Sequence, residues 1–577
     1  MSKNKEILLH LEQLRDFLRS KNDTACVILQ NDPHMSEYVA DYYKIREFFS
    51  GFNGSAGTLV VGKDFAVLWT DGRYFLQAET QLEGSNIELY RSGMENVPTL
   101  EDFLQEKVGR DGVVVANSNV ISANDWEKMK EKFNLLHDDE WEGIWENRPI
   151  LKKSNIWRLD WAEKEQPFLE KLNKIRNVMS AESGDYYLVS TLEEFSWLFN
   201  LRADDIAYTP VVRGFAIIGL SRVMIFIDAV MPFNIEGVEI YPYNNVLQTL
   251  SSLEGKILLD KEKVNALLYN VCNDNFEVKC IKSPITLMKA VKSELEIDGC
   301  KRANLNDGVV WVRLMMYIEE ALQKRIKLTE LSVSDKITRL KAENNDFVCE
   351  SFESIVAYAD NAAIVHYAPT KETDKEIQPE GFLLIDSGTH YIYGTTDITR
   401  TLVCGKLTTE EKRRFTQVLK GMIAVATAEF TRETKGKDLD SLARQFFKED
   451  GLDYLHGTGH GVGSVLCVHE EGVRLSPKGE DFVRENVITS DEPGYYKAGE
   501  FGIRIENMLL CRAKEQETLN FCNLTLVPID VRAIDLTLLT EIEKDWINNF
   551  HREIKTKLKG FLTDNENKWL NERFYEI

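Results

Sequence analysis

Apolar residues in the N-terminal part of the chain follow two patterns, one helical and one extended. Residues 1–21 place apolar side chains at helical spacing and predict an amphipathic helix. Short runs rich in β-branched and aromatic residues at 25–30, 49–61 and 65–78 predict strands, because Gly and Asn separate them at places that suit tight turns. Helical segments lie between these runs. The pattern predicts a mixed α and β domain over residues 1–152.

The same order of elements returns between residues 153 and 288. The strand-like run at 186–190 corresponds to the run at 25–30, and the run at 221–228 corresponds to residues 65–71. The sequence identity between the two halves is weak, but the order and spacing of the elements agree. An internal duplication is the simplest explanation. The alternative, two unrelated α/β segments of similar composition, stays open on the sequence alone.

A third region begins near Lys289 and takes in residues 289–577. Ser293 and Glu296 form a capping-box pattern ahead of a helix, and a second, strongly apolar helix is predicted through 309–322. Strand-forming runs then dominate, interrupted by one amphipathic helix at 409–432, and the C-terminal segment returns to helical spacing. The predicted fold class is α+β, with two α/β domains followed by a strand-rich domain that has a helical tail.

The charge balance limits which partners to expect. Acidic residues outnumber basic residues 93 to 70 in the 577-residue chain, which gives a net charge of -23. Such a surface repels phosphate backbones and anionic lipids, so neither a nucleic acid nor a membrane is an expected partner.

Cysteine usage and hydropathy indicate the compartment. Nine scattered cysteines without a CxxC pair indicate a reducing compartment with buried free thiols. No apolar run is long enough to span a bilayer, and the N-terminal helix lacks the continuous apolar core of a signal peptide. We therefore expect a cytoplasmic protein.

Histidines and carboxylates gather in the third region. Five of the nine histidines lie between positions 366 and 469, and four carboxylates stand among strand-forming residues, where a carboxylate is costly unless a cation compensates it. Taken singly, each carboxylate could end a strand or pair with a nearby arginine. Together they form an ordered set: Asp386, Asp397, His460, Glu492 and Glu506. Four carboxylates and one imidazole suit Mn²⁺, Mg²⁺, Fe²⁺ or Co²⁺, and five ligands suit two ions bridged by carboxylates.

The segment HGTGHGVG at 456–463 spaces His456 and His460 as the HExxH zinc proteases space their two histidines. Four glycines in this segment argue against a helix and indicate a backbone crowded against a ligand or a neighbouring strand. The glutamate of HExxH is absent, which excludes that mechanism.

Four segments in this order and spacing resemble the catalytic domain of the pita-bread metallopeptidases, the family of aminopeptidase P, prolidase, methionine aminopeptidase and creatinase. They are IDSGTHYIYGTTDITRT, HGTGHGVG, DEPGYY and GIRIEN. Further segments, among them SGFNGSAGTLVV, LFNLRADDIAYTPVV, VHYAP and DWINNFH, extend the resemblance over essentially the whole chain to aminopeptidase P of the long, three-domain cytosolic type. The resemblance implies two creatinase-like α/β domains, at 1–152 and 153–288, and a pita-bread catalytic domain at 289–577.

The resemblance also implies roles for single residues. All five residues of the ordered set become metal ligands, with Asp397 and Glu506 bridging two divalent ions, of which Mn²⁺ is the first choice and Co²⁺, Fe²⁺ and Zn²⁺ are alternatives. The implied catalytic and substrate-binding residues are His366, His456, His469, Glu492 and Arg504. The implied reaction is hydrolysis of the bond between an N-terminal residue and a penultimate proline. A hydroxide shared by the two ions would attack, and Glu492 would accept the proton.

Two other functions remain as alternatives. Prolidase, which cleaves only Xaa-Pro dipeptides, would share the five ligands, and a non-catalytic pita-bread binding protein would keep the fold without them. The duplicated N-terminal half favours aminopeptidase P over prolidase, and the complete ligand set disfavours the binding protein and creatinase. The resemblance further implies a homodimer formed through the catalytic domain.

Several conspicuous residues carry no functional prediction. His390 is expected on a surface hairpin, and the remaining histidines on the surface or in helices; these are His10, His34, His137 and His551. Trp69 and Tyr74 are expected in the core of the first domain, and Cys404 and Cys467 in buried packing.

Overall fold

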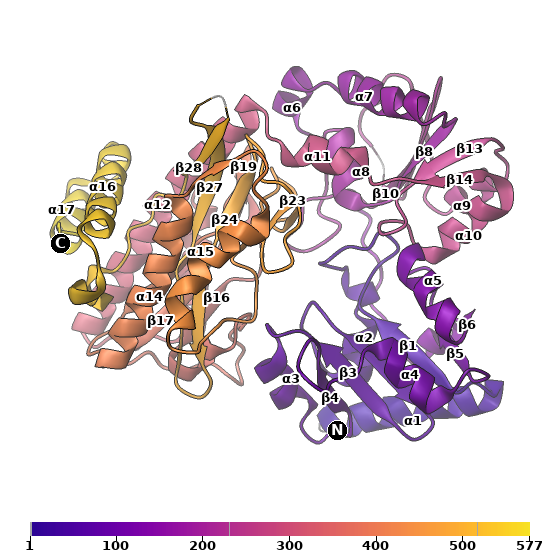
Figure 1. The fold of residues 1–577 in the computed structure, drawn as a ribbon, viewed down its shortest axis with the longest axis horizontal. Helices are drawn as coiled ribbons and strands as arrows, with labels where there is room; N and C mark the ends of the chain where they lie inside the picture. Colours follow the sequence, from indigo (N-terminus) through magenta and orange to yellow (C-terminus); the bar gives the residue numbers. More distant parts are fainter. Residues whose placement is uncertain (1–2, 230, 516) are drawn as a thin grey trace. The chain divides into compact units, whose positions relative to one another are not determined.

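The computed structural model describes residues 3–229, 231–515 and 517–577. The chain forms two compact units, the first ending at Ile285 and the second beginning at Thr286. Figure 1 draws both, coloured from indigo at the N-terminus to yellow at the C-terminus. Within the described ranges, every helix is too short or too polar to span a lipid bilayer.

The first unit opens with a domain on a six-stranded mixed sheet of order β4-β3-β2-β1-β5-β6. The strands are β1 Ala25–Leu29, β2 Thr58–Gly62, β3 Ala66–Thr70, β4 Glu88–Arg91, β5 Val113–Ala116 and β6 Asn134–His137. The helices are α1 Lys3–Lys21, α2 Ile45–Ser50, α3 Phe75–Leu82, α4 Leu100–Val108 and α5 Ala123–Lys132. The apolar stripe of α1, including Leu11 and Leu14, packs on one face of this sheet. Trp69 and Tyr74 are buried in the core, as predicted.

The second domain of this unit has a sheet of order β12-β11-β10-β8-β13-β14. Its strands are β8 Tyr186–Val189, β10 Gly214–Gly219, β11 Val223–Ile227, β12 Val238–Pro242, β13 Lys256–Leu259 and β14 Glu277–Cys280, and β7 Trp157–Arg158 pairs separately with β9 Leu201–Arg202. The helices are α6 Asp160–Glu165, α7 Phe168–Ala181, α8 Leu192–Leu198, α9 Asn245–Leu250, α10 Ala266–Asn275 and α11 Pro284–Ala290.

The two sheets are built in the same way. In each, the central strand, β1 or β8, pairs antiparallel with β2 or β10, and parallel with β5 or β13, which follows a helix. The outer pairs β3–β4 and β11–β12 are both parallel. Identical order and identical strand directions confirm the predicted internal duplication.

His34 lies where these two domains meet, which corrects its assignment to the surface or a helix. Its ring is fully buried and stacks on Phe215 with centroids 4.2 Å apart. Nδ1 lies 2.6 Å from the carbonyl oxygen of Ser190, and Nε2 lies 2.8 Å from the hydroxyl of Tyr243. Burial lowers the pKa of His34 to about 4, so the ring is neutral near pH 7.

The helices of the second unit differ from the prediction in extent. The predicted helices after Ser293 and at 309–322 are one helix, α12 Glu294–Gln323, and Ser293 and Glu296 form its capping box as predicted. The predicted helix at 409–432 ends earlier, as α14 Thr409–Ala426, because the chain turns there into the short strand β21 Glu429–Thr431. The other helices are α13 Glu330–Ala342, α15 Gly436–Lys448, α16 Glu541–Leu558 and α17 Asp564–Arg573.

Four sheets make up the strand-rich part. They have the orders β15-β18-β19, β16-β17-β20, β21-β28-β27-β24-β22-β23 and β25-β26. The strands are β15 Phe347–Glu350, β16 Ile355–Tyr358, β17 Phe382–Asp386, β18 Thr389–Tyr391, β19 Gly394–Thr395, β20 Thr399–Val403, β21 Glu429–Thr431, β22 Gly459–Gly461, β23 Glu470–Leu475, β24 Ile488–Asp491, β25 Gly494–Lys497, β26 Phe501–Arg504, β27 Asn507–Ala513 and β28 Thr518–Asn523. One apolar core joins these strands to α12 and α14, with Trp311, Leu383, Leu419 and Leu509 among its fully buried members.

Burial corrects three further expectations. His390 lies on the predicted hairpin but is fully buried, with Nδ1 2.9 Å from the hydroxyl of Thr395. His551 lies in a helix, α16, as expected, and its side chain is buried there. All nine cysteines are free thiols, and two of them, Cys280 and Cys522, are exposed rather than buried. Two other cysteines, at 404 and 467, are buried as predicted.

Candidate metal centre

Strand pairing brings the five predicted ligands to adjacent strand ends. Asp386 ends β17 and faces Thr399 of β20, so the loop that carries Asp397 returns beside it. The ladder between β24 and β27 pairs Asp491 with Asn507. Glu492 directly follows β24 and Glu506 directly precedes β27, so these two residues lie at the same end of the strand pair. The amide of Glu506 donates to the carbonyl oxygen of Thr399 at 3.1 Å and so links the two sheets.

His460 is the middle residue of the short strand β22, between β23 and β24. The glycines around it are required by close backbone packing, because a Cβ on Gly459 would lie 2.0 Å from the carbonyl oxygen of Ser490. A Cβ on Gly461 would lie 2.6 Å from the carbonyl oxygen of Glu470. The predicted crowding of HGTGHGVG against a neighbouring strand is thus confirmed, and it fixes the position from which the imidazole extends.

The predicted ligand atoms converge. One atom each from Asp397, His460 and Glu506 lies within 4.8 Å of the other two, the separation expected of groups that could hold one ion. Nε2 of His460 lies 3.4 Å from Oδ2 of Asp397 and 3.5 Å from Oε1 of Glu492. Asp386 is close enough to raise the pKa of Glu506 through its charge.

The carboxylates strongly affect one another's protonation. Burial, reinforced by the charge of Asp397 and opposed by Arg504, raises the pKa of Asp386 to about 6. Burial and the charges of Asp397 and Asp386 raise the pKa of Glu506 well above its ordinary value, and burial likewise raises that of Glu492. Carboxyl groups packed this closely can be neutralised by protons, and a bound divalent cation would instead stabilise their ionised forms.

His460 differs from the carboxylates because its charged form is positive and is stabilised by them. Burial lowers its pKa, but contact with Asp397 and the charge of Glu492 outweigh burial and raise the pKa to about 9. Without a metal ion, this imidazole therefore holds a proton near pH 7 and serves as a local countercharge.

The donor set fits a pair of hard divalent cations. It combines four carboxylates with one imidazole, all buried or nearly so. Oδ1 of Asp386 is buried and has no hydrogen-bond partner among the described residues, whereas Oδ2 accepts from Arg504 at 2.6 Å. A buried carboxylate oxygen that accepts no hydrogen bond is available to bind a metal ion.

A chain of contacts ties predicted substrate residues to the centre. Arg504 donates from Nε and Nη2 to Asp386, at 3.2 Å and 2.6 Å, and from Nη1 to the hydroxyl of Tyr496 at 2.8 Å. That hydroxyl lies 2.9 Å from Nε2 of His456, and Thr399 donates to Glu506 at 2.7 Å. Tyr496 and Thr399 were not predicted as site residues, although both stand inside the quoted motifs, because neither is a metal ligand or a general base by type.

Two more histidines were predicted to bind substrate, His366 and His469. The ring of His469 meets the ring of His460 edge to face, with centroids 4.3 Å apart. His366 is half-buried and follows a short 3₁₀ helix, Ala359–Ala363, that packs closely on β26, where a Cβ on Gly502 would lie 1.7 Å from the carbonyl oxygen of Ala362. The structure thus gathers His456, His469 and Arg504 around the predicted ligands, and His366 follows a 3₁₀ helix that packs on β26, the strand that carries Arg504.

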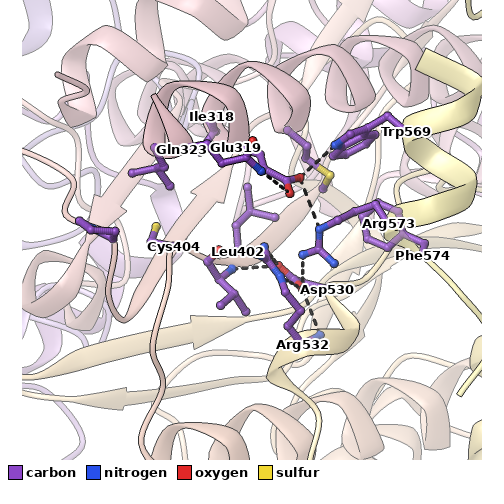
Figure 2. Close-up of a pocket in the computed structure, with 14 residues that line it drawn as sticks. Ile318, Glu319, Gln323, Leu402, Cys404, Asp530, Arg532, Trp569, Arg573 and Phe574 are labelled. Carbon is purple, nitrogen blue, oxygen red and sulfur yellow. Dashed lines mark hydrogen bonds and ion pairs between the residues drawn. The ribbon is translucent and has the colours of Figure 1, made fainter. Parts of the chain in front are cut away.

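A hollow of about 210 Å³ lies elsewhere in the second unit, between α12, the end of β20 and α17 (Figure 2). Its charged groups satisfy one another, because Asp530 accepts from Arg532 and Arg573 at 2.8 Å each, and the indole of Trp569 donates to Glu319 at 2.9 Å. None of the predicted site residues lines this hollow. It is therefore separate from the metal centre.

Family models match nearly all of the chain. Residues 10–141 and 147–296 each match a model of the creatinase/prolidase N-terminal domain. Residues 299–513 match metallopeptidase family M24, and residues 517–577 match the C-terminal region of peptidase M24.

Full-length relatives narrow the assignment. A protein of Laccaria bicolor named probable Xaa-Pro aminopeptidase P is 35% identical over 96% of this chain and 90% of its own length. The chain belongs to the aminopeptidase P family of M24 metallopeptidases. It is therefore a metalloaminopeptidase. A further member of the aminopeptidase P family, Xaa-Pro aminopeptidase 1 of Dictyostelium discoideum, is 34% identical over 98% of this chain and 95% of its own length.

Solved structures agree with this family. The X-prolyl aminopeptidase of Caenorhabditis elegans, described as a cytosolic enzyme with a di-nuclear active site, matches with a TM-score of 0.94 and 29% identity over 99% of this chain and 100% of that chain. A prolidase of Thermococcus sibiricus shares the fold, with a TM-score of 0.52 and 21% identity over 63% of this chain and 98% of that one.

Proposed function

We propose that this chain removes the N-terminal residue from peptides whose second residue is proline. The observation that carries the proposal is the convergence of Asp397, His460 and Glu506, with Glu492 3.5 Å from His460. It occurs in a chain that keeps all five predicted ligands and is similar over its full length to proteins named Xaa-Pro aminopeptidase. The di-nuclear site described for the Caenorhabditis elegans enzyme supports a pair of ions here as well.

Two divalent ions would be held by the five ligands, with Asp397 and Glu506 between them. Asp386 would complete one site, and His460 with Glu492 the other. When bound, the ions would lower the pKa of a shared water molecule and polarise the scissile carbonyl. Mn²⁺ is our first choice, with Co²⁺, Fe²⁺ and Zn²⁺ as alternatives, because a mainly carboxylate donor set accepts all four.

Glu492 would act as the proton carrier. Burial raises its pKa, so this carboxyl can hold a proton at a pH where an ordinary glutamate cannot. It would take the proton of the attacking water and pass it to the leaving nitrogen of proline.

The neighbouring histidines would bind and orient the substrate. His469, in edge-to-face contact with His460, would donate a hydrogen bond to the scissile carbonyl oxygen as negative charge develops there. His456, held by the hydroxyl of Tyr496, and His366 would flank the proline ring. Arg504 would hold Asp386 in place through its two hydrogen bonds.

Proline specificity has a chemical basis. The nitrogen that leaves belongs to a tertiary amide and carries no hydrogen, so an enzyme that recognises a backbone N–H at that position loses a hydrogen bond. Histidines around the ring recognise its shape instead. Removal of a single N-terminal residue requires that the free α-amine be recognised.

The location and the assembly are also proposals. We place the protein in the cytosol, because the Caenorhabditis elegans enzyme is described as cytosolic. We propose a homodimer formed through the catalytic domain, on the family resemblance alone. Sedimentation equilibrium of the purified protein would show twice the 66.3 kDa chain mass if this holds, and a single chain mass if it does not.

The decisive experiment is peptide cleavage by metal-stripped protein with and without added Mn²⁺. The substrates are an Xaa-Pro-Xaa tripeptide, the matching Xaa-Ala-Xaa tripeptide and an Xaa-Pro dipeptide. Mn²⁺-dependent release of the first residue from the proline tripeptide alone supports the proposal, and cleavage of the dipeptide alone identifies a prolidase. Glu506→Ala, purified in the same way, reveals any contaminating peptidase. If the protein binds metal but cleaves none of the three substrates, a non-catalytic binding protein is favoured.

A further inference from the structure

A charged cluster lies next to the metal centre but outside it. Glu470 is buried in the second unit between two lysines, and all three side chains are at most 5% exposed. Nζ of Lys289 lies 2.8 Å from Oε1 of Glu470, and Nζ of Lys292 contacts the other carboxylate oxygen. Lys292 also donates to the carbonyl oxygen of Lys289 at 3.0 Å. We call Lys289, Lys292 and Glu470 the lysine clamp.

Burial of the lysine clamp carries a desolvation penalty. It removes three charged groups from water and leaves one positive charge in excess, and replacing such buried ion pairs by hydrophobic residues of similar volume is often neutral or stabilising for the fold. Both carboxylate oxygens are held, each by a different ammonium group, which fixes the orientation of the carboxylate as well as its position. The two contacts therefore also restrain the chain segment that carries Glu470.

The two lysines come from a backbone that is itself fixed. Lys289 lies in the last turn of α11, and Lys292 directly precedes Ser293, the N-cap of α12. The amide of Lys292 donates to the carbonyl oxygen of Asn486 at 2.9 Å, and Val291 forms a bridge with Val487. The donors are therefore anchored to the chain segment that enters β24.

Glu470 is directly attached to a proposed substrate residue. It opens β23, where its backbone pairs with Gly461 of β22, and His469 is the residue before it. His469 in turn packs edge to face against His460, at 87° between the ring planes. The residues on either side of the His469–His460 contact are thus fixed, by β-pairing at Gly461 and by the lysine clamp at Glu470.

We propose that Glu470, held by Lys289 and Lys292, is a positioning residue for His469. The lysine clamp fixes the start of β23 so that the imidazole of His469 stays where it meets the scissile carbonyl. This inference rests on the proposed function for its catalytic readout. It concerns the placement of an imidazole and not the binding of metal ions.

Positioning and plain stabilisation predict different results. If the lysine clamp only stabilises the fold, its loss lowers the melting temperature and leaves the turnover of the folded protein unchanged. If it positions His469, its loss lowers kcat more than it raises KM, and the bound metal stays at the wild-type amount. An imidazole displaced by about 1 Å can cost up to about 100-fold in rate, so we expect kcat to fall about 10- to 100-fold.

The test is a double-mutant cycle between Glu470→Gln and His469→Ala on the Mn²⁺-loaded protein. Glu470→Gln alone should lower kcat, and in the His469→Ala background it should cause no further loss, because its effect passes through the imidazole. An equal loss in both backgrounds would overturn the proposal. Lys292→Met leaves one balanced ion pair, so it serves as the folded variant if Glu470→Gln does not fold.

A second readout needs no activity. In ¹³Cε1-histidine-labelled protein, the signal of His469, assigned by its disappearance in His469→Ala, should move in Lys292→Met and stay unchanged in Asp298→Asn. Asp298 forms an exposed pair with Lys301 on α12 and is the matched control. An unmoved signal in Lys292→Met contradicts positioning. If the wild type cleaves no Xaa-Pro peptide, the proposed function fails while this signal still decides the positioning.

Discussion

Binding of divalent ions to the five-ligand centre should release protons near neutral pH. His460 has a pKa of about 9, compared with an ordinary value of 6.5, so it is protonated in the metal-free protein at about pH 7.5. A histidine binds a metal ion only through its neutral imidazole, so the ion has to displace this proton. Glu506, whose pKa is raised well above its ordinary value, adds to the release in the same direction.

The size of the effect follows from the pKa of His460. At about pH 7.5 the pH lies about 1.5 units below this pKa, and each unit is worth about 1.4 kcal/mol, so removal of the proton costs about 2 kcal/mol. That cost lowers the apparent affinity about 30-fold. The affinity should therefore rise at least about tenfold per pH unit until the pH approaches about 9.

Stability of the metal-free protein should change with pH in the opposite sense. Asp386 and His460 both have folded-state pKa values above their unfolded-state values, so the stability they contribute is present at low pH and is lost as the pH rises. For Asp386 the loss falls between pH 3.8 and about 6 and amounts to about 3 kcal/mol; for His460 it falls between pH 6.5 and about 9. Bound metal removes both losses, so the metal-induced rise in melting temperature should grow with pH.

The assay is titration calorimetry with Mn²⁺ in two buffers of different ionisation enthalpy, repeated across pH. We expect at least about one proton released per protein at about pH 7.5. His469→Ala is the control, because its ring contacts His460 but is not a proposed ligand, and it should keep the wild-type pH dependence. An affinity that is flat across neutral pH, with no proton release, would show that His460 is not charged in the metal-free centre.

Three other predictions concern single residues. Glu506→Ala should lose metal binding and activity together, because this carboxylate is proposed to serve both ions; two metals bound normally in elemental analysis would make the ligand assignment wrong. His456→Ala should keep its metals and lose turnover in the same peptide assay, and unchanged kcat would remove it from the substrate site. Gly459→Ala should lower the unfolding free energy by about 1–3 kcal/mol in urea, because its Cβ would lie 2.0 Å from the carbonyl oxygen of Ser490, whereas Gly560→Ala, with open space around it, should not.

Local patterns in the sequence were sufficient for several features of the fold. The repeated order of strand-like runs predicted the duplication, because each run needs only its own alternation and its flanking turns to form a strand. The capping box at Ser293 and Glu296 is a local hydrogen-bond pattern and appears as predicted. The domain bounds at 152 and 288 stay predictions, since the structure divides the chain only at 285 and 286.

Burial could not be predicted in the same way. The residues next to His34 in the sequence do not predict its contacts with Ser190 and Tyr243. The residues next to His390 do not predict that its hairpin is buried. The lengths of α12 and α14 were also missed, because tertiary packing decides how far a helix with marginal residues continues.

The sequence by itself determined which side chains are available for chemistry: a spaced set of two aspartates, a histidine and two glutamates, each costly in a strand without a cation. Only the tertiary structure decided that Asp397, His460 and Glu506, up to 109 positions apart, have ligand atoms within 4.8 Å of one another. It also revealed the supporting groups, Tyr496, Thr399 and the lysine clamp. The physical reason is that residue type and spacing fix local conformation, whereas pairing between distant strands fixes which charges meet and therefore which pKa values shift.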